Sequence, residues 1–441
     1  MILVDDALKA RQDAGNPIRV GVVGAGFMCQ GLTNQITHSV PGMRVVAISN
    51  RKVERAAGVY KYAGYTDVAF ADTQRALDDA IASERPVVTE DAFLLARSGL
   101  IDVLVDATGS VEFGARVTLE AFKHGKDVVL LNAEIDATIG PILQTYAAKH
   151  GVILSACDGD EPGAQMNLYR WVKGVGLTPR VIGNVKGLQD PYRNPTTQQG
   201  FAEKWGQNPA MVTSFADGSK ISFEQAIVAN ATGFKVRSRG MSRGLEYRGD
   251  IMQIGQLYDV EECRQLGGII DYVVGTPLTK VYVLAEHDDP KQQHYLNLYK
   301  MGEGPLYSFF VPYHLVHFEV PIAIARVVLF RDPVAKPLGG PVVEVCAVAK
   351  RDLKAGETLD DYGMYMTYGE AVNAEEMCEQ QYLPEGLVEG CTLVRDIPKN
   401  SVVRYGDVVL PHGRIADRLR AEQYRHFRGE TWLEDVLKVA A

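Results

Sequence analysis

Hydrophobic and polar positions alternate in blocks along the first third of the chain. Between stretches with the apolar spacing of helices (residues 31–39, 52–64, 113–125 and 139–151) lie short β-branched runs, at residues 19–23, 44–49, 103–107, 127–131 and 152–156. Several of the helical stretches end on a glycine, which suits a left-handed helix cap. Strands and helices that alternate in this way predict an α/β domain with a parallel sheet and right-handed crossovers.

The pattern changes after residue 156. Gly, Pro, Asn and Asp punctuate residues 157–300, and strand-like pieces such as 280–285 appear among them. Residues 333–341 are rich in Pro and Gly and have the composition of a linker, and short strands and turns follow over 342–411. We therefore expect three domains: an α/β domain over 1–156, an α+β substrate-binding domain over 157–340, part of which can return to the first, and a small β-rich domain with a tail over 341–441.

Composition and charge narrow the function classes. A chain of 441 residues with 46% hydrophobic and 23% charged residues can bury a sizeable core, and its net charge of −9 disfavours binding to nucleic acid or to anionic lipid. The most apolar stretch, 314–330, contains His317, Glu319, Pro321 and Arg326, so we expect no membrane span. The six cysteines are far apart and are expected to be small buried residues. We expect a cytoplasmic protein without a signal peptide.

A glycine loop follows the first apolar run. In Gly24-Ala-Gly26, the first glycine permits a tight strand-to-helix turn, and the second lets a pyrophosphate approach bare backbone at a helix N-terminus, which Phe27 and Met28 begin. The third glycine of this dinucleotide-binding fingerprint is replaced by Cys29, a small residue that can still pack the helix on the strand. The loop predicts a Rossmann domain, and a glycine turn without a ligand is the alternative.

The end of the second run indicates which dinucleotide binds. An NAD-binding fold usually has a carboxylate there for the ribose 2′-hydroxyl, but this chain has Ser49, Asn50, Arg51 and Lys52. Hydroxyl, amide and guanidinium groups can donate hydrogen bonds to a 2′-phosphate, which a carboxylate would repel. This segment favours NADP(H) over NAD(H). The alternative is that its cations only solvate the start of the next helix.

Polar residues also follow the fourth and fifth runs. Thr108, Gly109 and Asn132 come at the carboxyl ends of predicted parallel strands, which is where open α/β sheets bind ligands. We place these three residues around the nicotinamide half of the cofactor. Ordinary turn residues are the alternative interpretation.

Charged clusters mark the middle of the chain. Asp158, Asp160 and Glu161 suit metal binding or acid–base chemistry, because packed carboxylates repel one another, but a solvated acidic turn is an equal alternative. Lys186 precedes a glycine-containing bend and Lys220 follows one. Either lysine can stabilise an oxygen on which negative charge develops.

A basic loop and two histidines complete the candidates. Lys235, Arg237, Arg239 and Arg243 form a local basic cluster that suits a phosphate monoester, or else a solvated loop. His314 and His317 are too few for a metal site, and we expect His314 to be a hydrogen-bonded core or interface residue.

Several of these motifs together resemble a known family. The chain resembles the homoserine-dehydrogenase-like oxidoreductases with a C-terminal SAF domain, and within them the deoxyxylulose-phosphate reductoisomerase-like (DRL) group, over roughly residues 15–411. The resemblance rests on Gly24-x-Gly26, Asn132-Ala-Glu134-Ile-Asp136, Gly159-Asp160-x-Pro162-Gly163, Ser214-Phe-Ala-Asp217-Gly218-x-Lys220, Pro312-Tyr-His314-Leu and, in the tail, Gly356-Glu357 and Gly406-Asp407-Val408. True homoserine dehydrogenases have an Asn-Lys pair where this chain has Asn132-Ala133, which disfavours homoserine as the substrate.

The resemblance implies a specific reaction. It is the NADPH-dependent conversion of 1-deoxy-D-xylulose 5-phosphate to 2-C-methyl-D-erythritol 4-phosphate, in isoprenoid synthesis. It implies oxygen stabilisation by Lys186 and Lys220, and a base or a Mg²⁺ or Mn²⁺ ligand in Asp160 or Glu161, with Asp158 as a further metal candidate. It also implies a homodimer and a phosphorylated small-molecule substrate held by Arg193, Asn194, Lys204, Asp217, Arg237 and Arg239.

Two other functions remain open at this point. One is an NADP-dependent dehydrogenase that acts on a sugar acid, a sugar phosphate or a homoserine-like compound without rearranging its carbon chain. The other is a non-catalytic sensor that binds NADPH and uses the SAF-like part as a binding module. Identification of the product separates the first from a reductoisomerase, and the absence of turnover identifies the second.

Overall fold

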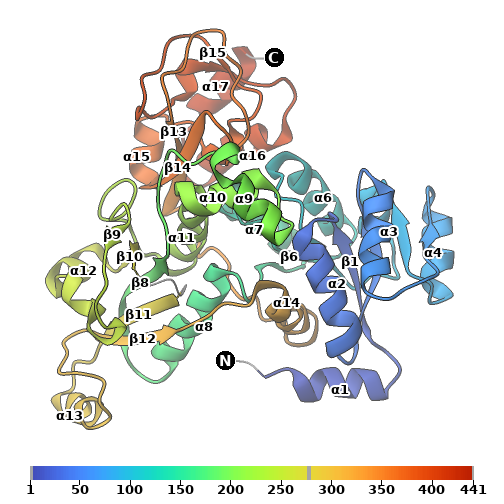
Figure 1. Cartoon of the computed structure of the whole chain (residues 1–441), viewed down its shortest axis with the longest axis horizontal. Helices are drawn as coiled ribbons and strands as arrows, with labels where there is room; N and C mark the ends of the chain where they lie inside the picture. Colours follow the sequence, from blue (N-terminus) through green and yellow to red (C-terminus); the bar gives the residue numbers. More distant parts are fainter. Residues whose placement is uncertain (1–2, 276–279, 440–441) are drawn as a thin grey trace. The chain divides into compact units, whose positions relative to one another are not determined.

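The computed structural model describes residues 3–275 and 280–439 (Figure 1). Its contacts divide the chain into two compact units. The Rossmann unit contains the chain up to Asp160 together with Leu315–Lys336, and the second unit contains Glu161–His314 and Pro337–Ala441. The chain passes between the two units after Asp160 and after Lys336. The predicted boundaries at 156/157 and 340/341 lie within a few residues of these two points. The tail groups with the middle of the chain, so the structure has two units where three domains were predicted.

The Rossmann unit is built on one parallel sheet of seven strands, in the order β3-β4-β2-β1-β5-β6-β7. In chain order the strands are β1 (Ile18–Val23), β2 (Met43–Ser49), β3 (Ala69–Phe70), β4 (Val87–Thr89), β5 (Val103–Asp106), β6 (Asp127–Leu130) and β7 (Leu154–Ala156). This confirms the predicted α/β fold class, and the five predicted strand runs are β1, β2, β5, β6 and β7. The short strands β3 and β4 were not predicted.

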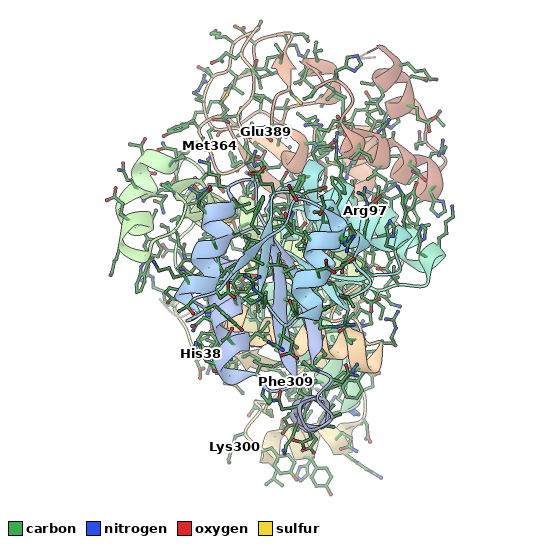
Figure 2. All side chains as sticks on the ribbon, turned by 90° about the vertical axis from the view of Figure 1, so that its right-hand side faces the viewer. His38, Arg97, Lys300, Phe309, Met364 and Glu389 are labelled. Atoms are coloured by element: carbon green, nitrogen blue, oxygen red, sulfur yellow. The ribbon has the colours of Figure 1, made fainter. Side chains whose placement is uncertain are left out.

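Helices connect and cover these strands. They are α1 (Asp5–Asp13), α2 (Phe27–Ser39), α3 (Val53–Tyr62), α4 (Gln74–Ala82), α5 (Ala92–Arg97), α6 (Val111–Lys123), α7 (Ala133–His150), α14 (Val316–Ala325) and the π-helical turn η2 (Arg326–Phe330). The last two return to this unit after the second unit, and α14 packs against α2. Figure 2 shows the side chains that fill the space between the strands and their helices. Val20, Val22, Val103 and Val105 are fully buried there, as expected for a sheet covered on both faces.

Helix α7 carries a carboxyl group inside the core. Asp136 is 4% exposed, and burial alone raises its pKa to about 7. An unfolded aspartate ionises near pH 4, so between pH 4 and 7 the folded state binds the extra proton. The free energy of unfolding therefore falls as pH rises through this window, by roughly 4 kcal/mol.

Asp136→Asn tests this pH dependence because it removes the ionisation at almost constant shape. We expect urea unfolding to show a free-energy gain of the variant over the wild type that grows by a few kcal/mol between pH 4.5 and pH 8. Asp13→Asn, at an exposed position in α1, serves as the matched control. A difference between Asp136→Asn and wild type that does not change with pH would contradict the prediction.

The second unit contains a mixed sheet of five strands in the order β12-β11-β8-β10-β9. The strands are β8 (Thr178–Lys186), β9 (Leu245–Glu246), β10 (Ile269–Val274), β11 (Lys280–Glu286) and β12 (Tyr307–Val311). Strand β8 runs parallel to β10 and antiparallel to β11. The associated helices are α8 (Glu161–Gly174), α9 (Pro195–Trp205), α10 (Pro209–Asp217), α11 (Ser219–Thr232), η1 (Ile251–Leu257), α12 (Val260–Leu266) and α13 (Pro290–Leu298).

Side-chain alternation along β8 sets the two faces of this sheet. Val181 and Val185 belong to the apolar cluster formed with Ile254 of η1 and Cys263 of α12. Residues 182, 184 and 186 therefore lie on the opposite face. Helix α8 packs on β8 and β11, and α11 packs on α8 and β10. The start of α8, the end of β8 and the first turns of α11 thus lie close together on one side of the sheet.

The tail of the second unit packs on α11. It comprises β13 (Val343–Ala349), β14 (Thr367–Asn373), α15 (Ala374–Glu379), η3 (Glu385–Leu387), β15 (Thr392–Leu393), η4 (Tyr405–Asp407), β16 (Val408–Val409), α16 (Ile415–Arg428) and α17 (Trp432–Val439). Strands β13 and β14 form an antiparallel pair that contacts α11, and β15 and β16 form a second pair. The predicted content of short strands is present, and two longer helices follow it.

Candidate active site

The glycine loop of the Rossmann unit has the geometry of a phosphate cradle. Gly24 has a φ of +104°, and a side chain there would meet the carbonyl oxygen of Ala107 at 2.8 Å, so the turn requires glycine. Gly26 precedes α2 as its N-cap, without a side-chain capping bond, and a Cβ atom on it would meet nothing within 4 Å. Cys29 is fully buried, with a pKa raised to about 12 by burial, and packs α2 on the sheet. These residues fit a dinucleotide pyrophosphate.

The end of β2 lies beside this loop. The amide of Gly24 donates to the carbonyl oxygen of Ser49 at 2.8 Å. Ser49 itself is 2% exposed, and the side-chain oxygen of Asn50 accepts a bond from the amide of Lys52. Arg51 is exposed. In the predicted 2′-phosphate segment, Arg51 and Lys52 are therefore exposed, Asn50 is partly exposed and Ser49 is buried.

The structure corrects the prediction for Asn132. This residue is 1% exposed, its side-chain oxygen caps α7 at the amide of Ile135, and its nitrogen donates to Asp106 at 3.1 Å. The hydroxyl of Thr108 also donates to Asp106, at 2.7 Å. Asn132 therefore joins the ends of β5 and β6 and caps α7, so the structure gives its side chain a structural role. Thr108 and Gly109 are partly exposed in the loop above it.

Charged side chains gather in the second unit where α8 begins and β8 ends. The ammonium nitrogen of Lys186 lies 2.7 Å from a carboxylate oxygen of Glu161 and 3.7 Å from one of Glu224. Lys220 lies 3.7 Å from Glu224, and the imidazole Nε2 of His314 lies 3.5 Å from Glu161. We call these five residues the charged cluster. The charged cluster thus contains Lys186, Lys220 and Glu161, three of the four predicted catalytic residues.

Local structure explains how the charged cluster forms. Glu161 is the first residue of α8, and Lys186 is the last residue of β8. Lys220 and Glu224 are one turn apart on α11 and so lie on the same face. The two lysine side chains are 9% exposed, and those of Glu161 and Glu224 are 5% and 1% exposed. Water screens such charges weakly, so two ammonium groups here can strongly stabilise a negatively charged oxygen.

Metal binding is compatible with part of this site. Glu161 and His314 offer a carboxylate oxygen and an imidazole nitrogen, and the buried Asp160, which precedes Glu161, offers another carboxylate. Asp158, in contrast, pairs with Arg326 at 3.1 Å, and both side chains are 1% exposed. This internal ion pair removes Asp158 from the metal candidates.

The predicted phosphate-binding residues do not form one clamp. Among the described residues, Arg193 pairs with Asp190, Arg237 with Glu262 and Arg239 with Glu370, and Lys204 lies exposed above the ring of Trp205. Asn194 caps α9 through the amide of Thr197. The four cations thus contact four different partners, of which Asp190 and Trp205 lie in the same segments as Arg193 and Lys204. Asn194 has a structural role as a helix cap.

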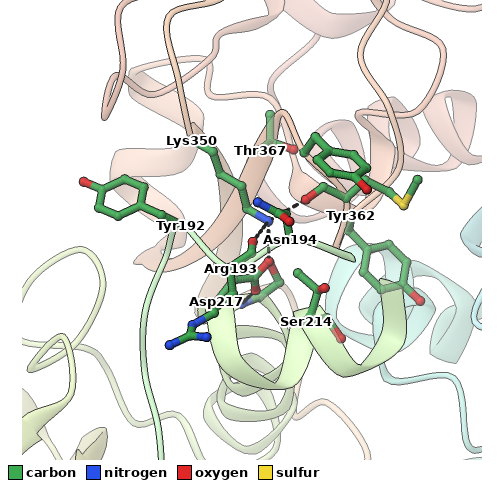
Figure 3. A network of polar contacts seen from close by, with 12 residues as sticks. Tyr192, Arg193, Asn194, Ser214, Asp217, Lys350, Tyr362 and Thr367 are labelled. Atoms are coloured by element: carbon green, nitrogen blue, oxygen red, sulfur yellow. Dashed lines mark hydrogen bonds and ion pairs between the residues drawn. The ribbon is translucent and has the colours of Figure 1, made fainter. Parts of the chain in front are cut away.

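Asp217 also differs from its prediction. It is fully buried, and its carboxylate accepts a bond from the ammonium group of Lys350 at 2.8 Å (Figure 3). The same ammonium group donates to the carbonyl oxygens of Arg193 and Met364, each at 2.8 Å. Burial raises the pKa of Asp217, and Lys350 opposes this shift. Asp217 is therefore part of a buried polar network that joins α10 to the tail, and its predicted contact with substrate stays a prediction.

Sequence reasoning did not assign catalytic roles to Glu224 and His314. The spacing of Glu224 from Lys220, four residues on a predicted helix, was the available signal for the first. His314 stands in the Pro312-Tyr-His314-Leu motif but lies more than 150 residues from Glu161 in the chain. No periodicity in the sequence connects the two.

Comparisons with known proteins agree with an oxidoreductase. Residues 159–320, which contain the whole charged cluster, match the family model of the catalytic domain of the oxidoreductase DRL. The match ends before the tail, so the SAF-like assignment stays a prediction. A search of curated proteins gave no match. Among the described residues, no helix has the length and apolar character needed to cross a membrane.

Solved structures similar to this chain include several oxidoreductases. A Thermotoga maritima protein described as a probable dehydrogenase is 11% identical with a TM-score of 0.42, covering 73% of this chain and 91% of that chain. Apo scyllo-inositol dehydrogenase from Lactobacillus casei is 12% identical with a TM-score of 0.41, covering 72% and 90%. A 3-ketoreductase from Actinomadura kijaniata, in complex with NADP, is 14% identical with a TM-score of 0.35, covering 72% and 91%.

Proposed function

We propose that this protein is an NADP(H)-dependent oxidoreductase that acts on a carbonyl or hydroxyl group of a small polar substrate. The observation that carries the proposal is the buried pair of Lys186 and Glu161, 2.7 Å apart, inside the segment that matches an oxidoreductase catalytic domain. Negative charge develops on the oxygen of a carbonyl group during reduction, and buried ammonium groups held in place by carboxylates can stabilise that charge.

The Rossmann unit supports the choice of cofactor. Gly24 and Gly26 leave room for the pyrophosphate, and the exposed guanidinium of Arg51 can donate two hydrogen bonds to a 2′-phosphate. When bound, NADPH supplies a hydride from its nicotinamide ring.

Arg51→Glu tests the preference for NADPH. The substitution removes a charge-assisted pair and adds a repelling carboxylate, so we expect NADPH to bind at least tenfold more weakly and NADH to bind within about twofold of wild type. Fluorescence titration of both cofactors measures this. Arg55→Glu, at another exposed position in α3, is the matched control. Tighter binding of NADH than of NADPH to the wild type would contradict the assignment.

The charged cluster supplies the remaining chemistry. The Lys186 ammonium donates a hydrogen bond to the substrate oxygen and can transfer its proton from Nζ when that oxygen becomes an alkoxide. Glu161 holds Lys186 in position at 2.7 Å, and Glu224 keeps Lys186 and Lys220 close together despite their like charges. The carboxylate of Glu161 is also placed to accept a proton from a substrate hydroxyl group.

The finer proposal is a reductoisomerase that converts 1-deoxy-D-xylulose 5-phosphate to 2-C-methyl-D-erythritol 4-phosphate. The match of residues 159–320 to the DRL catalytic domain supports it. The rearrangement needs a base for a substrate hydroxyl and cations for the charge that develops on oxygen, and Glu161, Lys186 and Lys220 are groups of these kinds. A Mg²⁺ or Mn²⁺ ion would take Glu161, His314 and Asp160 as ligands and would stabilise the same oxygen charge.

Product analysis tests both levels of the proposal. The protein is incubated with NADPH, Mg²⁺ or Mn²⁺, and 1-deoxy-D-xylulose 5-phosphate, and the product is identified by NMR. A branched methylerythritol phosphate supports the reductoisomerase. Oxidation of NADPH with an unbranched product supports a dehydrogenase that does not rearrange its substrate. The absence of NADPH oxidation with this compound and with a panel of sugar acids and sugar phosphates would contradict the proposed function.

A further inference from the structure

Three amide side chains on the elements that carry the charged cluster are buried without hydrogen-bond partners among the described residues. Gln165 of α8, Asn184 of β8 and Gln225 of α11 are each 0% exposed. Within the described part of the chain, neither the oxygen nor the nitrogen of any of the three amides has a partner. Folded proteins satisfy nearly all buried polar groups, so these six atoms call for polar partners from outside the described chain.

Gln165 and Asn184 lie at similar distances from the Lys186–Glu161 pair, because of the directions in which α8 and β8 run. Helix α8 begins at Glu161, and β8, the next strand, ends at Lys186, so the contact between Glu161 and Lys186 joins the start of one element to the end of the other. Gln165 lies one turn along α8 on the same face as Glu161, about 6 Å from it. Asn184 lies two residues before Lys186 on the same face of the sheet, about 6.6 Å away. Both amides are therefore one layer below the Lys186–Glu161 pair.

The third amide, that of Gln225, belongs to α11, the helix that also carries Lys220 and Glu224. Gln225 follows Glu224, whose carboxylate lies 3.7 Å from Lys186, and α11 packs against α8. The three elements that supply Glu161, Lys186, Lys220 and Glu224 thus each also supply an uncharged amide. An occupant that contacts Lys186 is expected to contact the amide layer as well.

The chemistry of the amide layer selects its occupant. An amide offers donors and an acceptor but no charge, so it suits hydroxyl groups, which both donate and accept, and offers nothing to neutralise a phosphate or carboxylate. We propose that Gln165, Asn184 and Gln225 form a subsite for the vicinal hydroxyl groups of a polyol chain of the substrate, next to the carbon whose oxygen Lys186 contacts. This assignment rests on the proposed function for the identity of the reacting end. A phosphate group of the substrate would then bind outside the amide layer.

Polyol binding to the full chain tests the subsite. Erythritol carries a hydroxyl on every carbon, whereas butane-1,4-diol has the same chain length and lacks the two inner hydroxyls. Thermal unfolding is measured over increasing concentrations of each compound. We expect erythritol to raise the Tm with a saturating dependence and butane-1,4-diol to give no saturating shift. General stabilisation by a polyol as a cosolute is linear in concentration and so is distinguished.

Gln165→Met removes one amide at nearly constant volume, and we expect it to weaken erythritol binding about tenfold. Gln225→Met is the second variant if Gln165→Met does not fold, and Gln423→Met, at a fully buried glutamine of α16, is the matched control. A linear response of the wild type, an equal response to both compounds, or unchanged binding in both amide variants would overturn the proposal. NADPH titration of the same samples is a separate readout: cofactor binding without erythritol binding refutes the subsite alone, and the reverse refutes the proposed function alone.

Discussion

Replacement of Lys186 by methionine is expected to lower the turnover number by about 10²–10³-fold. Methionine keeps the length of the side chain and removes the ammonium group that is 2.7 Å from Glu161. The oxygen of the substrate then loses a buried cation in the transition state, where its charge is largest. The measurement is the rate of NADPH oxidation at saturating substrate, with circular dichroism to show that the variant is folded.

Two comparisons make this prediction specific. Lys173→Met, at an exposed lysine of α8, should retain turnover within about twofold of wild type. Lys220→Met should lose less activity than Lys186→Met, because Lys220 contacts Glu224 at 3.7 Å, whereas Lys186 contacts both glutamates. A folded Lys186→Met variant with turnover within a few-fold of wild type would contradict the assignment of this residue.

The second large effect is expected at Lys350. Replacement of this residue by methionine leaves the fully buried carboxylate of Asp217 without its partner and two carbonyl oxygens without their donor. Removal of one member of a buried ion pair typically costs about 3–5 kcal/mol, a large part of the stability of a domain. We expect a loss of this size in the free energy of unfolding, measured with urea at pH 7.

The double variant Lys350→Met with Asp217→Asn separates the charge from the packing. Neutralising the stranded carboxylate should restore part of the lost stability, so the double variant should be more stable than Lys350→Met alone. If the second substitution lowers stability further, the pairing of Asp217 with Lys350 is not the main contribution. Asp217→Asn alone should not change substrate affinity beyond its effect on folding, because the contact of Asp217 with Lys350 gives this carboxylate a structural role.

Much of the Rossmann unit could be predicted because its signals are local. Strands β1, β2, β5, β6 and β7 are apolar runs, and Gly24 and Gly26 stand at the turn where the backbone requires them. The return of Leu315–Lys336 to this unit was foreseen only as a possibility, because the contact of α14 with α2 joins segments nearly 300 residues apart. Two-residue strands such as β3 carry too short a pattern to detect.

The grouping of charged residues could be predicted from residue type alone, whereas the partners of individual polar side chains could not. Lys186, Lys220 and Glu161 are charged groups that the fold brings together. Asp217 and Asn132 have equally polar side chains, but Lys350 and Asp106, which determine their structural roles, lie far from them in the sequence. The unpartnered amide of Gln165 had no sequence signal, because burial of a glutamine depends on the packing of three elements.

The most direct test of the account is transfer of deuterium from NADPH deuterated at C4 of the nicotinamide to the product. The wild type, incubated with this cofactor and 1-deoxy-D-xylulose 5-phosphate, is expected to give a product that carries one deuterium on carbon, as measured by mass spectrometry. Lys186→Met is expected to give almost none in the same time. A wild-type protein that binds NADPH but transfers no deuterium to this or any other sugar-derived carbonyl compound would contradict the account.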